Sequence, residues 1–162
     1  MTRKDLIGEL SKGYTQDFQY FMPFIFDAEN AYRKDGVTIA IERVPGDDGG
    51  ETFCGIDKSS HPHFDFSNAT PKAVCDVYFS EWGTEGIDML PNPFKFCYFD
   101  CAVNAGVGRA KAILAKTGQE AKAFLDEREQ FYRRLAAAVD HDRQFLAGWI
   151  SRVQNLRHFL HI

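Results

Sequence analysis

The chain has 162 residues, of which 44% are hydrophobic and 26% are charged, and this suits a single globular domain with a sizeable core. Its formal net charge of −4 argues against a nucleic-acid-binding protein, because such proteins usually carry a basic surface. No apolar run has the length of a signal-peptide core or of a membrane span, so we expect a protein that is made in the cytoplasm and has no membrane span. We also expect a monomer.

Helices are predicted to dominate the first thirty residues. Residues 5–10 and 17–22 have helical patterns, and Pro23 either kinks the second helix or opens a new one. The stretch stays strongly apolar up to Phe26 and is expected to end near Asn30. The end of this helix therefore joins apolar residues directly to polar ones.

A strand and a loop are predicted in the next part of the chain. Residues 37–44 alternate apolar with polar or small side chains, which is typical of a strand, and a Gly-Gly pair that suits a turn follows them. Residues 57–68 are polar and rich in turn formers. We expect them to form a loop in which His61 and His63 are solvated, and the alternative is that these histidines contact substrate.

A helix that is apolar nearly all round is predicted in the second half. Thr70 caps an earlier helix over residues 71–82. Residues 94–103 then lack a polar face, which is typical of a central buried helix. Asp100 inside this helix must have a partner, and we expect Arg109 or nearby backbone amides to serve.

Two further helices are predicted after Gly118, each with one narrow apolar stripe. The stripes indicate that both helices pack onto the rest of the protein, and the alternative is that an exposed Trp149 stacks on a ring of the substrate. Arginines are frequent in this part of the chain. A solvated helix face is their expected place, and a basic patch that faces the substrate is the alternative. They are Arg128, Arg133, Arg134, Arg143, Arg152 and Arg157.

The cysteines are predicted to be buried free thiols, because the sequence contains no Cys-x-x-Cys pair. Their spacing to one another and to His61 and His63 differs from that of the common structural zinc sites. We therefore expect no metal and no cofactor. The four residues are Cys54, Cys75, Cys97 and Cys101.

One carboxylate stands at the end of the first apolar stretch, where Glu29 follows Phe24, Ile25 and Phe26. Apolar surroundings and the negative end of a helix dipole both oppose ionisation of a carboxylate. Cleavage of a glycosidic bond needs a proton donor of this kind, together with a second group that supports the cationic sugar or activates water. Glu29 is thus a candidate general acid, and a solvated surface glutamate is the alternative.

Two stretches around this glutamate resemble the motifs of one family: residues 29–32, Glu-Asn-Ala-Tyr, and residues 47–56, Asp-Asp-Gly-Gly-Glu-Thr-Phe-Cys-Gly-Ile. The family is glycoside hydrolase family 108, which comprises lysozyme-like N-acetylmuramidases, phage endolysins and secretion activator proteins. Its motifs are Glu-Gly-Gly-Tyr and Asp-Pro-Gly-Gly-x-Thr-x-x-Gly-Ile, and the likeness continues in order to Val153. Two departures concern the site, since Asn30 and Ala31 replace the glycines and the segment between the motifs is longer.

The resemblance implies a mainly α, α+β lysozyme-like fold, a helical bundle around a buried central helix with a small β-hairpin at the cleft. It divides the single domain, residues 1–162, into a catalytic region at about 21–116 and a C-terminal helical pair at about 117–162 that resembles a peptidoglycan-binding segment. The implied substrate is the glycan strand of peptidoglycan. An enzyme without a signal peptide would reach the cell wall through a holin, through lysis or through a secretion system.

The resemblance also assigns roles to individual residues. Glu29 donates a proton to the oxygen between N-acetylmuramic acid and N-acetylglucosamine. Asp47 steadies the cationic sugar or orients a water molecule, and Thr52 holds that water. Three further residues are expected to contact the substrate: Tyr32, Glu51 and Asn104.

Several alternatives stay open. In a second alignment Glu42 takes the place of Glu29, and Asp48, Glu51 or Glu42 can replace Asp47 as the second carboxylate. A lytic transglycosylase needs only the proton donor, and it leaves 1,6-anhydro ends where a hydrolase leaves reducing ends. The two replaced glycines also leave room for a catalytically inactive cell-wall-binding module, which is the rival from a different class.

Overall fold

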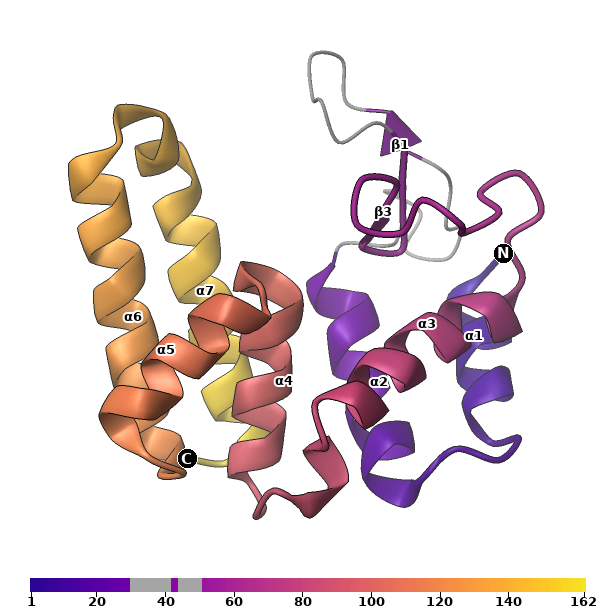
Figure 1. The fold of residues 1–162 in the computed structure, drawn as a ribbon, viewed down its shortest axis with the longest axis horizontal. Coiled ribbons are helices and arrows are strands. Elements are labelled where there is room, and N and C mark those ends of the chain that lie inside the picture. The colour runs from indigo at the N-terminus through magenta and orange to yellow at the C-terminus, as the bar shows by residue number, and fades with distance from the viewer. Residues whose placement is uncertain (30–41, 44–50) are drawn as a thin grey trace. The chain divides into compact units, whose positions relative to one another are not determined.

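The structure, a computed structural model, describes residues 1–29, 42–43 and 51–162 (Figure 1). The chain divides into two compact units, Met1–Glu85 and Gly86–Ile162. In the described residues the first unit combines helices with a small antiparallel sheet, and the second is helical. The predicted class, mainly helical with a small sheet, is therefore confirmed. That residues 1–162 act as one domain stays a prediction.

Two helices open the first unit. Helix α1 (Arg3–Leu10) begins with a capping box, in which the Thr2 hydroxyl accepts a hydrogen bond from the Asp5 backbone N–H at 3.2 Å and the Asp5 carboxylate accepts one from the Thr2 N–H at 2.7 Å. Helix α2 (Gln16–Ala28) continues through Pro23, so no new helix opens at the proline. Its buried face supplies much of the core of this unit: Phe18, Phe21, Met22, Ile25 and Phe26.

Helix α3 (Pro71–Thr84) completes the helical part of the first unit and packs beside α1 (Figure 1). It starts where the sequence predicts, because the Thr70 hydroxyl accepts a hydrogen bond from the Ala73 N–H at 3.1 Å and proline follows the cap. Trp82 is fully buried and meets the ring of Phe18 edge-on at 5.5 Å. The same face of α3 also buries Val74, Cys75 and Tyr78.

The sheet has the order β1-β2-β3, and its strands are β1 (Glu42–Arg43), β2 (Glu51–Phe53) and β3 (Ile56–Asp57). Phe53 lies opposite Ile56, and both are buried, which anchors the β2–β3 hairpin on the core. Strand β1 falls within the strand predicted over residues 37–44, whose other residues lie outside the described part of the chain.

The second unit is built around one buried helix. Every residue of α4 from Phe94 to Cys101 is buried, which confirms the predicted central helix. Helices α6 and α7 run side by side in this unit (Figure 1). Its elements are η1 (Ile87–Met89), α4 (Phe94–Ala105), α5 (Val107–Thr117), α6 (Ala121–Ala138), η2 (Asp140–Phe145) and α7 (Leu146–Leu160).

The buried carboxylate of α4 has partners other than the predicted ones. Asp100 accepts hydrogen bonds from Arg128 at 2.7 Å and from Arg152 at 2.8 Å and 3.0 Å. Burial opposes ionisation of Asp100, but the two guanidinium groups together outweigh it and hold the pKa of this carboxyl below its ordinary value. Arg109 instead lies over the ring of Phe131, 4.0 Å from its centroid. The prediction of Arg109 as the partner is wrong.

The expected solvated arginine face is also wrong for two of its members. Arg128 is fully buried and Arg152 is 9% exposed, because both turn inward to the carboxylate of Asp100. Arg133 and Arg134, by contrast, keep exposed side chains and pair with glutamates on the surface of α6. The spacing of basic residues along a helix does not distinguish these two situations.

All four cysteines are free and buried, as the sequence predicts. Burial raises the pKa of the Cys54, Cys75 and Cys97 thiols to about 12 and that of Cys101 to about 11. Such thiols stay protonated at neutral pH, so their role is packing.

Among the residues that the structure describes, no helix combines the length and the apolar character needed to cross a bilayer.

Candidate active site

Glu29 occupies the C-terminal end of α2, as the sequence predicts. Its backbone N–H donates to the carbonyl of Ile25 at 2.9 Å, which makes Glu29 the C-cap of the helix. Ile25 and Phe26, just before it, are fully buried, and the Oε1 atom of Glu29 is shielded from solvent although the residue as a whole is half-buried. The carboxyl group therefore stands at the negative end of a helix dipole, beside apolar core.

The carboxylate of Glu29 packs against the turn of the β2–β3 hairpin. A Cβ atom added to Gly55 would lie 2.7 Å from Cγ of Glu29 and 2.9 Å from its Oε2, closer than side chains tolerate. Gly55 also has φ of +78°, which favours glycine. The turn thus presents bare backbone to the carboxylate, and this brings the candidate general acid to the predicted junction of helix and hairpin.

Tyr78 joins α3 to the same turn. Its side chain is 2% exposed, and its hydroxyl donates a hydrogen bond to the carbonyl oxygen of Cys54 at 2.6 Å. The hydroxyl oxygen also lies 2.6 Å from the position that a Cβ of Gly55 would take, on the side where the Glu29 carboxylate packs. Sequence reasoning did not find this residue, because a tyrosine in the apolar stripe of a helix reads as an ordinary core residue.

The hairpin places two further candidate groups beside each other. Thr52 on β2 is half-buried, and its Cα lies opposite that of Asp57 on β3 and that of Glu42 on β1. The Asp57 carboxylate accepts hydrogen bonds from the Ser59 hydroxyl and from the Ser60 N–H at 2.9 Å. Burial opposes its ionisation, but these hydrogen bonds outweigh it, so the pKa of Asp57 lies below its ordinary value. An ionised carboxylate therefore stands next to Thr52.

Asp57 was missed by sequence reasoning, although a signal for it is present. An aspartate followed by serines two and three residues later is typical of a turn in which the carboxylate caps backbone N–H groups. That pattern predicts an ionised, fixed side chain at residue 57.

The loop after β3 is tied to α3 through a histidine. The Nε2 atom of His61 lies 3.0 Å from Oε1 of Glu81, and the His61 N–H donates to the carbonyl of Asp57 at 3.0 Å. Burial raises the pKa of the Glu81 carboxyl, although its contact with His61 acts in the opposite direction. The expectation that His61 is solvated is wrong, because Glu81 gives it a partner, whereas His63 is exposed as predicted.

A family comparison connects this geometry to a class of enzyme. Residues 32–106 match the family model described as Glycosyl hydrolase 108. This match places the chain in glycoside hydrolase family 108. No curated protein and no solved structure gives a significant match. Family membership supports a glycoside hydrolase that degrades peptidoglycan, and it agrees with a mainly helical, lysozyme-like fold.

The matched range of the family 108 chain covers most of the site. It contains Thr52, Gly55 and Tyr78, and it begins shortly after Glu29. Glu42, the rival general acid, lies inside the range and belongs to β1. The comparison therefore fixes the family and leaves the choice between the two glutamates to experiment.

Some predicted residues of the family 108 site cannot be placed. Tyr32, Asp47 and Asp48 lie outside the described residues. Glu42 and Glu51 are placed by their backbone, in β1 and β2. Their roles stay predictions.

Asn104, a predicted substrate contact, belongs to the second unit of the glycoside hydrolase. Its side-chain oxygen accepts hydrogen bonds from Tyr132 at 2.5 Å and from Arg128 at 3.2 Å. Arg128 also donates to Asp100, so Asn104 is part of the buried ion cluster. The structure gives this asparagine a bracing role, and a contact with substrate stays untested.

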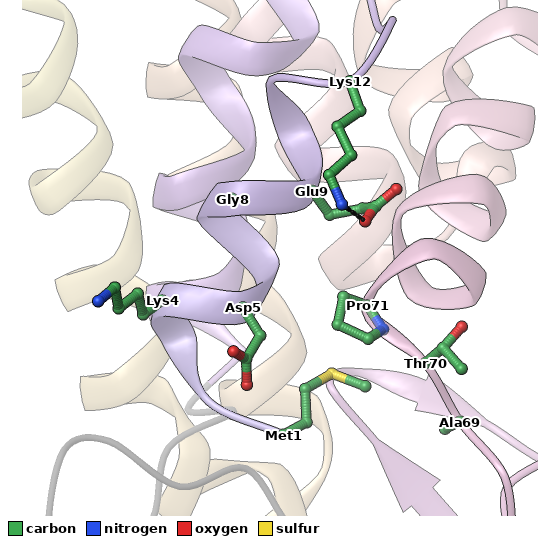
Figure 2. A pocket seen from close by; sticks show the side chains of 9 residues that line it. All are labelled: Met1, Lys4, Asp5, Gly8, Glu9, Lys12, Ala69, Thr70 and Pro71. Carbon is green, nitrogen blue, oxygen red and sulfur yellow. Dashed lines mark hydrogen bonds and ion pairs between the residues drawn. The ribbon is translucent and has the colours of Figure 1, made fainter.

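A groove of about 680 Å³ lies elsewhere in the first unit (Figure 2). It runs along α1 and is lined by charged side chains that include Lys4, Asp5, Glu9 and Lys12. Lys12 pairs with Glu9 at 3.1 Å, and Glu29 does not line the groove. Because Glu29 lies outside this groove, the groove is not the candidate active site. In the described part of the chain, no three potential metal ligands converge either.

Proposed function

We propose that this family 108 glycoside hydrolase is an N-acetylmuramidase, which cleaves the bond between N-acetylmuramic acid and N-acetylglucosamine with Glu29 as general acid. The observation that carries the proposal is the position of Glu29, at the end of an apolar helix with its carboxyl group against the β2–β3 turn. Gly55 and Tyr78 lie beside this carboxyl group, and both belong to the segment that matches the family.

The surroundings of Glu29 suit a proton donor. A general acid must hold its proton until the leaving oxygen arrives, and both apolar neighbours and a helix C-terminus favour the neutral carboxyl. Ile25 and Phe26 supply the apolar neighbours, and α2 supplies the dipole. One carboxyl oxygen is shielded from solvent, and this desolvation also favours the neutral carboxyl.

The second half of the reaction needs a group on the hairpin. In the proposal Asp47 steadies the cationic sugar or orients a water molecule, and Thr52 holds that water. The ionised Asp57 stands opposite Thr52, so negative charge is already fixed on this part of the sheet. The bond between the anomeric carbon of the muramic acid and the leaving oxygen breaks as the proton of Glu29 passes to that oxygen. Water adds to the anomeric carbon and loses one proton to Asp47, and exchange with solvent then restores the proton of Glu29. The products therefore carry reducing muramic ends.

The test compares three glutamate variants on purified peptidoglycan sacculi. Glu29→Gln is expected to lower activity by about 10²–10⁴-fold, since that is the usual contribution of a general acid. Glu42→Gln tests Glu42 as the alternative general acid. Glu85→Gln is the matched control, because Glu85 caps the C-terminus of α3 as Glu29 caps that of α2. Full activity in Glu29→Gln together with loss of activity in Glu42→Gln would refute the assignment.

The reaction products distinguish hydrolysis from lytic transglycosylation. Mass spectrometry of digested sacculi should detect reducing muramic ends, whereas 1,6-anhydro ends would make the protein a lytic transglycosylase. A wild-type protein that pellets with sacculi yet releases no fragments would instead be a binding module.

We propose in addition that the C-terminal helices bind the glycan. Four aromatic rings form a continuous row there: Tyr132 stacks on Trp149 at 5.1 Å, Trp149 contacts Phe145 at 5.9 Å, and Phe145 contacts His141 at 5.4 Å. Phe145 is 44% exposed, and exposed aromatic rings can stack on sugar rings. In a Glu29→Gln background, Phe145→Ala should weaken pelleting with sacculi, whereas Val139→Ala, at an equally exposed apolar residue outside the row, should not.

A further inference from the structure

The turn between β2 and β3 has an unusual backbone. Cys54 and Gly55 have φ of +54° and +78°, so both residues are in the left-handed region. Two-residue hairpins often use such turns, but asparagine, aspartate and glycine are the residues that favour them. Cysteine is sterically disfavoured there, and a strained residue persists only where its surroundings hold it in place.

Tyr78 supplies the polar contact that holds the turn. Its hydroxyl donates to the carbonyl oxygen of Cys54 at 2.6 Å, and the tyrosine itself is buried in the core. Its ring meets the ring of Phe26 at 6.2 Å, and Phe26 belongs to the last turn of α2, just before Glu29. One side chain of α3 therefore contacts both the strained residue of the hairpin and the helix that carries the proton donor.

The left-handed conformation of the turn has one evident result. It brings the backbone of Gly55 so close to Glu29 that a single added carbon would lie within 3.0 Å of two Glu29 atoms. The main chain of the turn thus backs the carboxyl group. A turn that relaxed to an ordinary conformation would remove this support.

We propose that Tyr78 is a positioning residue for Glu29, acting through its hydrogen bond to Cys54, which keeps the turn against the carboxyl group. This inference rests on the proposed role of Glu29. Tyr78 is buried, so it acts on the placement of the proton donor and not on the binding of glycan. Misplacement of a reacting group by about 1 Å can lower a rate about 100-fold.

The test removes one hydroxyl. Tyr78→Phe keeps the ring and deletes the hydrogen bond to Cys54. The matched control is Tyr14→Phe, which deletes a 2.8 Å hydrogen bond between a tyrosine and Asp76 on the same helix, α3. On soluble, uncross-linked glycan strands, Tyr78→Phe is expected to lower kcat by about 10–100-fold with KM within about two-fold of wild type, whereas Tyr14→Phe leaves both constants near wild type.

A merely structural role for Tyr78 would give a different pattern. All assays are run well below the melting temperature of each variant, so that the folded protein is compared. If Tyr78→Phe and Tyr14→Phe have equal kcat, or if Tyr78→Phe raises KM and leaves kcat unchanged, the inference is wrong. Gly55→Ala provides a second route, because the added carbon displaces the Glu29 carboxyl directly. Its loss of kcat and that of Tyr78→Phe should be less than additive, since both act on one contact.

Glu29→Gln in the same series separates this inference from the proposed function. If Glu29→Gln is inactive and Tyr78→Phe behaves as Tyr14→Phe does, only the positioning role fails. If Glu29→Gln stays active, the proposed function fails and the positioning role fails with it.

Discussion

The buried ion cluster of the second unit allows a quantitative test of how that unit is held together. Asp100→Asn keeps the shape of the side chain but removes its charge. Arg128, which is fully buried, and Arg152, which is 9% exposed, then lose the carboxylate that they share. Two like charges would remain close together in the interior, where water cannot screen them.

The loss of stability in Asp100→Asn depends on the burial of the ion pair and not on the distance between its atoms. Removal of one partner from a buried ion pair costs about 3–5 kcal/mol of unfolding free energy, because a buried charge is left uncompensated. The matched control is Asp126→Asn, whose carboxylate lies 2.6 Å from Arg157 but is 73% exposed. Exposed pairs contribute about 0–1 kcal/mol. The shorter of the two contacts is thus expected to matter far less.

Denaturant unfolding followed by tryptophan fluorescence measures this difference. The sequence has two tryptophans, and one lies in each unit, so a Trp82→Phe background leaves Trp149 as the reporter of the second unit. Asp100→Asn should lower the midpoint strongly at an unchanged m-value, and Asp126→Asn should barely move it. If the two variants agree within about 0.5 kcal/mol, the burial argument is refuted.

Three further predictions concern stability. The pKa of Asp100 is lowered in the folded state, so its contribution to the free energy of unfolding is fully present above the unfolded pKa of about 3.9. This contribution should be lost as the pH falls further, and acid unfolding followed through Trp149 checks this. Thr70→Ala removes the N-cap of α3 and should lower the unfolding free energy by about 0.5–2 kcal/mol in urea, with an unchanged stability counting against the cap. Gly55→Ala should destabilise the protein more than Gly118→Ala does. Both glycines have positive φ, but an added Cβ at Gly118 has nothing within 4 Å. Equal melting temperatures of the two variants would contradict this.

Features set by neighbouring residues could be predicted from the sequence. The start of α3 at Thr70 depends on a hydroxyl and the backbone three residues later, and the burial of α4 depends on an apolar run. Glu29 was placed at a helix end for the same reason. Each of these can be recognised from residues that lie close together in the sequence.

Features that need contacts between distant segments could not be predicted. Asp100 is 28 residues from Arg128 and 52 from Arg152, so the nearer Arg109 was the natural but incorrect choice. Tyr78 reaches the carbonyl of a residue 24 positions away. No local pattern distinguishes a core tyrosine that only packs from one that holds a strained turn.

The burial of every cysteine makes the four thiols almost inert toward redox chemistry. The raised pKa keeps the four thiols protonated at neutral pH, and burial keeps oxidants away from them. Transfer from a reducing to an oxidising compartment should therefore leave the four thiols free. The same property makes the natural sequence suitable for labelling, because one cysteine introduced on the surface would be the reactive thiol and would accept a dye or spin label without prior removal of the native four.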